Sequence, residues 1–140
     1  MDKRVVFFID DEDSMTLSWR NCLGVVFDVK YYNVYPGFEP IYNDIISYNP
    51  CVIIQDVMMK DARTKIINIE AGIEIAEAIK DTLVKLRIPL IFFSNREFPD
   101  FGTDFSELDY PPELLYYRSK LKVGYQTLLK EVNDVLSGVI

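Results

Sequence analysis

Five polar side chains stand directly after short apolar runs of the chain. They are Asp10 and Asp11 after residues 5–9, Asp56 after 51–55, Ser94 after 89–93, and Lys120 after 114–119. Three carboxylates brought together raise one another's pKa unless a cation lies among them. Mg²⁺ suits such a place, because it takes one or two carboxylates and completes its shell with water and phosphate oxygens. A lysine and a hydroxyl would hold the phosphoryl oxygens, so the set predicts an aspartyl acyl phosphate.

Each of these residues also has an ordinary structural explanation. The acidic run 10–13 is typical of a loop that caps a helix. Asp56 could simply end a strand, Ser94 suits a turn, and Lys120 suits a solvated helix start. What favours a phosphoryl site is their joint occurrence, in this order and each at the end of an apolar run.

The apolar runs predict strands that alternate with amphipathic helices. The strands are expected at 5–9, 29–35, 51–55, 89–93 and 114–119, and the helices at about 13–24, 38–48, 71–86 and 123–136. This order is typical of an α/β fold, a flavodoxin-like five-stranded parallel sheet with helices on both faces. In such sheets the ligand site lies beyond the carboxyl ends of the strands, where the polar residues fall.

Apolar spacing also predicts which helix residues face the sheet. In the helix at 13–24 the contacts include Leu17 and Leu23, and in the helix at 38–48 Ile45 and Ile46 share one face.

Composition limits the classes of protein to consider. The 140 residues, 49% hydrophobic, suffice for one domain spanning 1–140 with no attached output domain. The net charge of −7 argues against nucleic acid or anionic lipid as the main partner. The longest apolar runs are too short to span a bilayer, and no leader is evident, so a cytoplasmic protein without membrane insertion is expected.

Histidine is absent from the sequence. This excludes Ser–His and Cys–His catalysis and any metal site with a histidine ligand. If the phosphoryl donor is a phosphohistidine, that histidine belongs to another protein. Cys22 and Cys51 lie in apolar surroundings without metal-ligand spacing and are expected to be buried free thiols.

Four segments of the sequence resemble the receiver domains of two-component response regulators, the CheY-like family. They are VVFFIDDED at 5–13, NPCVIIQDVMM at 49–59, PLIFFS at 89–94 and YRSK at 117–120. The resemblance covers nearly the whole chain, and the segment ending in Asp56 is its most specific part. The resemblance implies a signalling protein and not an enzyme with a separate substrate.

The resemblance assigns roles to matching residues. Asp56 would accept a phosphoryl group from a histidine kinase or phosphotransfer protein. Asp11 would bind Mg²⁺ directly with Asp10 assisting, and the backbone carbonyl of Met58 would complete the metal site. Ser94 and Lys120 would hold the phosphoryl group, and on activation Tyr117 would turn inward with Ser94. A downstream protein would read this change as a population shift.

The sequence departs from the family in several places. Lys60 stands where the family usually has a proline after the acceptor segment, and Asn95 stands where it mostly has a small residue. Leu121 stands where the family has a proline directly after the lysine that matches Lys120, and in the family a cis peptide bond joins that lysine and proline. The segment 60–72 predicts an enlarged loop beside Asp56. The segment 97–113, broken by prolines, predicts a fourth helix that is irregular or shortened, with at best one turn at 104–109.

Two other functions fit parts of the sequence. A haloacid-dehalogenase-type phosphatase needs Asp-x-Asp after the first strand, and Asp11 and Asp13 have that spacing, but Asp56 is then unexplained. A receiver-like docking module that is never phosphorylated fits the departures at Leu121 and Asn95. Phosphoryl uptake distinguishes the receiver from the docking module.

Overall fold

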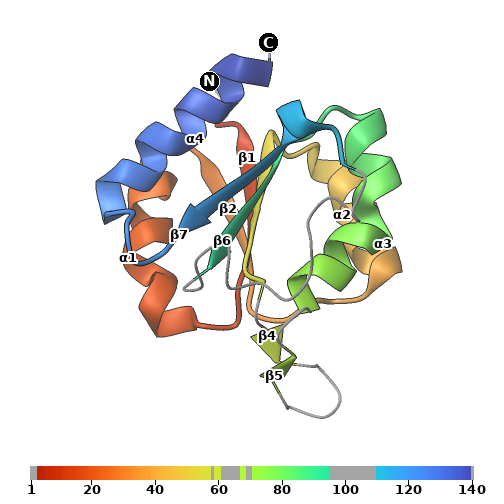
Figure 1. Ribbon diagram of the computed structural model, residues 1–140, viewed down its shortest axis with the longest axis horizontal. Helices are drawn as coiled ribbons and strands as arrows, with labels where there is room; N and C mark the ends of the chain where they lie inside the picture. Colours follow the sequence, from red (N-terminus) through yellow and green to blue (C-terminus); the bar gives the residue numbers. More distant parts are fainter. Residues whose placement is uncertain (1–2, 58, 61–66, 69–70, 95–109, 140) are drawn as a thin grey trace.

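The computed structural model describes residues 3–57, 59–60, 67–68, 71–94 and 110–139, and its main feature is a five-stranded parallel sheet (Figure 1). The strand order is β2-β1-β3-β6-β7. The strands are β1 (Val5–Ile9), β2 (Asp28–Tyr32), β3 (Val52–Gln55), β6 (Leu90–Ser94) and β7 (Leu115–Ser119). The helices are α1 (Asp13–Gly24), α2 (Phe38–Tyr48), α3 (Ala71–Lys85) and α4 (Tyr125–Val139), with a 3-10 turn, η3 (Pro112–Leu114). The predicted flavodoxin-like α/β fold is confirmed.

The helices form one layer on each face of the sheet, α1 with α4 and α2 with α3 (Figure 1). Alternate residues of β1 explain the two cores: Phe7 packs toward α2 and α3, and Phe8 packs toward α1 and α4. Both are fully buried. A strand covered on both faces must be largely apolar, which is why β1 is apolar throughout and why β3 and β6 are apolar up to their last residues, Gln55 and Ser94.

Strand register brings the predicted polar residues to one edge. Ile9 lies opposite Gln55, so that Asp10 and Asp56 leave neighbouring strands at the same level. Ser94 lies opposite Ser119, so that Lys120 follows beside it. Parallel strands therefore place residues that are far apart in sequence at a common carboxyl edge.

Two predicted core contacts are wrong. Leu17 is 47% exposed and Ile46 is 52% exposed. On α1 the buried positions are Thr16, Trp19 and Leu23, and residue 17 lies about 100° further round the helix from Thr16. The buried hydroxyl of Thr16 is compatible with this face because it donates to the carbonyl of Glu12 at 2.8 Å.

The segment 60–72 contains secondary structure of its own. β4 (Met59–Lys60) and β5 (Ile67–Asn68) form a short antiparallel pair, which extends beyond the carboxyl edge of the sheet in Figure 1. The predicted turn of helix at 104–109 lies outside the described residues. Among the described residues, no helix is both long enough and apolar enough to cross a membrane.

Candidate functional site

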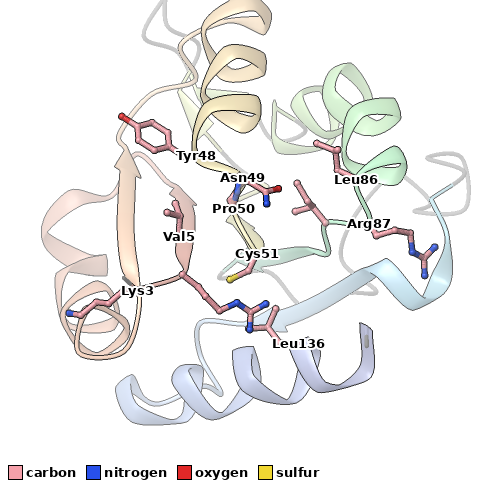
Figure 2. Close-up of a pocket in the computed structure, with 11 residues that line it drawn as sticks. Lys3, Val5, Tyr48, Asn49, Pro50, Cys51, Leu86, Arg87 and Leu136 are labelled. Carbon is pink, nitrogen blue, oxygen red and sulfur yellow. The ribbon is translucent and has the colours of Figure 1, made fainter. Parts of the chain in front are cut away.

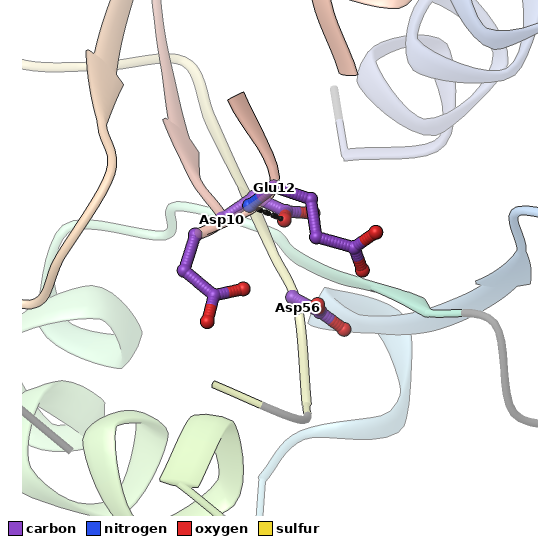
Figure 3. Close-up of side chains that lie close together, drawn as sticks. Asp10, Glu12 and Asp56 are labelled. Carbon is purple, nitrogen blue, oxygen red and sulfur yellow. Dashed lines mark hydrogen bonds between the residues drawn. The ribbon is translucent and has the colours of Figure 1, made fainter. Parts of the chain in front are cut away.

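Four carboxylates gather at the carboxyl edge of the sheet. Asp10, Asp11, Glu12 and Asp56 each offer one oxygen, and these oxygens all lie within 4.8 Å of one another. Figure 3 draws Asp10, Glu12 and Asp56, with the hydrogen bond that joins the first two. Asp10 is fully buried and Asp56 is 3% exposed. The structure thus brings together the three predicted aspartates and adds Glu12, whose sequence position alone is typical of a capping loop.

The side chain of Lys120 lies among these carboxylates. Its Nζ is 2.6 Å from Oδ2 of Asp10, 3.3 Å from Oδ2 of Asp56 and 3.5 Å from Oε1 of Glu12. Only 2% of this side chain is exposed. A buried ammonium with three carboxylate neighbours offsets much of their mutual repulsion.

Hydrogen bonds of the backbone position Asp56 and Lys120 at the sheet edge and orient the carboxylate of Asp56. The amide of Asp56 donates to the carbonyl of Ile9 at 2.9 Å, and the amide of Lys120 donates to the carbonyl of Ser94 at 2.8 Å. The Oδ1 atom of Asp56 accepts a 2.8 Å hydrogen bond from the amide of Val57. The carboxylate of Asp56 is therefore oriented by the backbone amide of the next residue, with Oδ2 toward Lys120.

The other predicted residues fall as follows. Ser94 is buried at the end of β6, beside the strand that leads to Lys120. Tyr117 is half-buried on β7, opposite Phe92. Met58 and Asn95 lie outside the described residues, so their predicted contributions remain predictions.

The peptide bond between Lys120 and the exposed Leu121 is trans, as are all peptide bonds of the described residues. Lys120 nevertheless lies within 3.3 Å of Asp56. The departure at Leu121 therefore leaves the pairing of lysine and aspartate intact.

Burial and charge alter the pKa of two groups in the site. The pKa of Asp10 is raised from 3.8 to about 7, chiefly by burial and next by the charge of Asp56, while Lys120 opposes the rise. For Lys120, burial lowers the pKa, but the charges of Asp56 and Asp10 outweigh burial, so the pKa is raised. The lysine is therefore charged at neutral pH, whereas burial disfavours the ionised form of Asp10.

This pKa of Asp10 predicts how stability depends on pH. Its value in the folded chain, about 7, exceeds the ordinary 3.8, so the folded state binds the proton more tightly and stability falls as pH rises from 4 to 7. Asp10→Asn removes this penalty. In EDTA at pH 8 we expect the variant to be roughly 1–3 kcal/mol more stable than the wild type. Urea unfolding at pH 5 and pH 8 measures both proteins; a difference that does not grow with pH would contradict this origin.

Asp13 lies outside the cluster. Its side chain is 69% exposed and forms an ion pair with Arg20. The second acid of a phosphatase Asp-x-Asp pair must reach the leaving group. In this structure the side chain of Asp13 pairs with Arg20 of the same helix and does not join the carboxylate cluster, which counts against the phosphatase.

A separate pocket lies at the opposite, amino-terminal edge of the sheet (Figure 2). Its lining includes the basic residues Lys3 and Arg87, which point away from each other in Figure 2. Lys3 donates to the carbonyl of Gly24 at 2.7 Å, and Arg87 pairs with Glu113 at 3.3 Å. None of the predicted site residues lines this pocket, so the carboxyl edge remains the candidate site.

No protein-family profile matches the sequence. No curated protein matches it either. Solved structures do match. The signal receiver domain of a modulated diguanylate cyclase from Desulfovibrio desulfuricans is 17% identical, with a TM-score of 0.67 over 99% of this chain and 97% of that one.

Two further solved structures match this chain over a similar length. The chemotaxis protein CheY4 of Vibrio cholerae is 18% identical, with a TM-score of 0.68 over 95% of this chain and 98% of that one. The receiver domain of DrrB from Thermotoga maritima, in a BeF3-activated form, is 21% identical, with a TM-score of 0.64 over 96% of this chain and 98% of that one. At these identities the likeness establishes the fold.

Proposed function

We propose that this chain, which has the fold of response-regulator receiver domains, accepts a phosphoryl group on Asp56 and signals through a partner protein. The observation that carries the proposal is the carboxylate of Asp56 at the carboxyl edge of β3, 3.3 Å from Lys120 and within 4.8 Å of the other three carboxylates. A buried aspartate within a cluster that contains both a cation and further carboxylates fits an acyl-phosphate site better than it fits a structural role.

The residues present fit Mg²⁺. Carboxylate oxygens are the hard donors that this ion prefers, and four of them lie within 4.8 Å of one another. Asp11 and Asp56 would hold it directly with Asp10 assisting, and the carbonyl of Met58 is a further proposed ligand. When bound, Mg²⁺ supplies charge neutralisation of the phosphoryl oxygens.

The proposed reaction is the transfer of a phosphoryl group from a phosphohistidine on another protein. A carboxylate oxygen of Asp56 attacks phosphorus, the P–N bond of the donor breaks, and the imidazole nitrogen takes the bond's electrons and then a proton from water. Lys120 and Ser94 hold the phosphoryl oxygens as charge develops on them. Later attack of water on the acyl phosphate restores the carboxylate and ends the signal.

The signal itself is proposed to be a shift between two conformations. β6 and β7 pair along their length, and Ser94 and Tyr117 lie on these two strands. Contact of Ser94 with the phosphoryl group would favour one arrangement of this strand pair, which the output protein reads. The cytoplasmic location and the absence of nucleic-acid binding remain predictions.

The docking module that is never phosphorylated is the alternative. The contact of Asp56 with Lys120 favours the receiver, because a site used only for docking has no need of a buried ammonium beside a buried aspartate. The intact-protein mass after incubation with acetyl phosphate, with Mg²⁺ and with EDTA, tests the function. One phosphoryl adduct that requires Mg²⁺ is expected; no adduct under either condition would favour the docking module.

Mg²⁺ is expected to stabilise the folded chain. A ligand that binds only the folded state at ten times its Kd adds about 1.4 kcal/mol. Asp11→Asn removes one carboxylate ligand and should abolish most of this gain. Thermal unfolding across a MgCl₂ series, matched for ionic strength with NaCl, measures it. The control is Asp134→Asn on α4, whose side chain is 61% exposed, and equal responses of both variants would contradict the assignment of Asp11.

A further inference from the structure

The loop of residues 10–12 is bound by β2 through both backbone groups of Asp10. The hydroxyl of Tyr31 donates to the carbonyl of Asp10 at 2.6 Å. The amide of Asp10 donates to the carbonyl of Tyr32 at 3.0 Å. The carbonyl of Asp10 belongs to the peptide that leads into Asp11, so the hydroxyl of Tyr31 fixes the plane of that peptide and the position from which the carboxylate of Asp11 projects.

The ring of Tyr31 is itself held by α1. The guanidinium carbon of Arg20 lies 3.7 Å from the centre of the ring. Arg20 donates to the carbonyl of Asp13 at 2.7 Å and to the hydroxyl of Thr16 at 3.1 Å. A guanidinium stacked on an aromatic face and bonded at its edge is restricted in orientation. Arg20 therefore limits the positions that the hydroxyl of Tyr31 can take.

The other end of the loop is bound by the same helix. Thr16 contacts the carbonyl of Glu12 twice, through its amide at 3.0 Å and its hydroxyl at 2.8 Å. Tyr31, Arg20 and Thr16 thus hold the loop from outside the carboxylate cluster.

We infer that Tyr31, held by Arg20, is a positioning residue for the Mg²⁺ site. The inference rests on the proposed function, because that function requires Mg²⁺ and the role of Tyr31 concerns the binding of this ion. Mg²⁺ demands nearly ideal octahedral geometry, so small displacements of a carboxylate ligand weaken binding. Partners one shell removed from a metal commonly change its affinity 10- to 100-fold.

The neighbouring Tyr32 provides a matched control. It lies on the opposite face of β2, where its hydroxyl donates to Oδ2 of Asp44 at 2.7 Å, and it packs in the core beneath α2 and α3. Tyr31→Phe and Tyr32→Phe each delete one hydroxyl and one short hydrogen bond. Only the bond of Tyr31 ends on the loop of residues 10–12.

The experiment measures ion affinity and stability of the wild type and both variants. Free Mn²⁺, a hard ion that suits carboxylates, is counted by electron paramagnetic resonance, and Mg²⁺ is then added as competitor. Urea unfolding in EDTA gives the stability without metal. We expect Tyr31→Phe to bind both ions about tenfold more weakly than the wild type, and Tyr32→Phe to bind them as the wild type does.

Two results would overturn the inference, and they are distinguishable. If the wild type binds the ions and Tyr31→Phe binds them equally well, the positioning role fails while the proposed function stands. If the wild type binds neither ion, the metal step of the proposed function fails as well. Loss of stability in EDTA without loss of ion affinity would show that the Tyr31 hydroxyl serves the fold alone.

Arg20→Lys tests the second part of the inference. Lysine keeps the positive charge but loses the planar stack on Tyr31 and the forked hydrogen bonds. We expect ion affinity to fall about threefold, less than for Tyr31→Phe, because the hydroxyl remains but is less restricted. Affinity equal to that of the wild type would remove Arg20 from the assignment.

Discussion

Asp56→Asn is expected to abolish phosphoryl uptake from acetyl phosphate. The amide that replaces the carboxylate lacks the anionic oxygen that attacks phosphorus. Asp10, the other buried carboxylate of the cluster, has a pKa raised by its burial, which disfavours its ionised, nucleophilic form. Intact-protein mass spectrometry at equal times should show the adduct on the wild type and none on the variant.

The same substitution should leave the fold intact. The oxygen of the substituted side-chain amide can still accept the hydrogen bond that the backbone amide of Val57 gives to Asp56. One buried negative charge beside Asp10 disappears, so the free energy of unfolding in EDTA should not fall. Asp134→Asn, at an exposed position of α4, serves as the control and should be labelled like the wild type. Labelling of Asp56→Asn at the wild-type rate would place the nucleophile elsewhere.

Lys120→Met is expected to cost about 3–5 kcal/mol of stability at pH 8 in EDTA. Methionine is close to lysine in length, so packing is largely kept and the loss reports mainly on charge. The lysine lies 2.6 Å from Asp10 and 3.3 Å from Asp56, both nearly inaccessible to water. Without it these carboxylates are buried without a compensating cation. Urea unfolding measures the change in free energy.

Two additions should reverse this loss if its cause is unpaired charge. Asp10→Asn in the Lys120→Met background should restore roughly half or more of the stability, because the carboxylate nearest to the lysine is then neutral. Millimolar Mg²⁺ should also stabilise Lys120→Met more than it stabilises the wild type, since the ion supplies the missing positive charge. If Lys120→Met is as stable as the wild type in EDTA, the lysine does not neutralise the cluster.

The sequence allowed the sheet and most of the site to be predicted, for one physical reason. Strands buried on both faces must be largely apolar, so their ends can be located where a run of apolar residues in the sequence gives way to polar ones. Asp10 and Asp56 each follow such a run, whereas Lys120 follows the partly buried edge strand β7. A parallel sheet gathers these strand ends at one edge.

Helix faces were predicted less well, because several residues of a helix are apolar and only some can face the sheet. On α1, Thr16 takes a buried position that hydropathy would not assign to it, because its hydroxyl bonds to Glu12. Leu17 is left facing solvent.

The supporting contacts of the loop could not be predicted. Tyr31 reaches the carbonyl of Asp10 across 21 positions of sequence, through the register that sets Phe8 opposite Tyr31. An aromatic residue in a strand predicts only burial; whether its hydroxyl meets a loop depends on that register. Glu12 was likewise indistinguishable from a capping residue until Lys120 was placed 3.5 Å away.

The central claim is that a phosphoryl group is bound covalently to Asp56, and chemical trapping tests it most directly. Borohydride reduces an aspartyl phosphate to homoserine, which peptide mass spectrometry locates in the chain. After incubation of the wild type with acetyl phosphate and Mg²⁺, homoserine is expected at position 56 alone, and it should be absent when EDTA replaces Mg²⁺. Homoserine at another position, or none although Mg²⁺ is bound, would contradict the account.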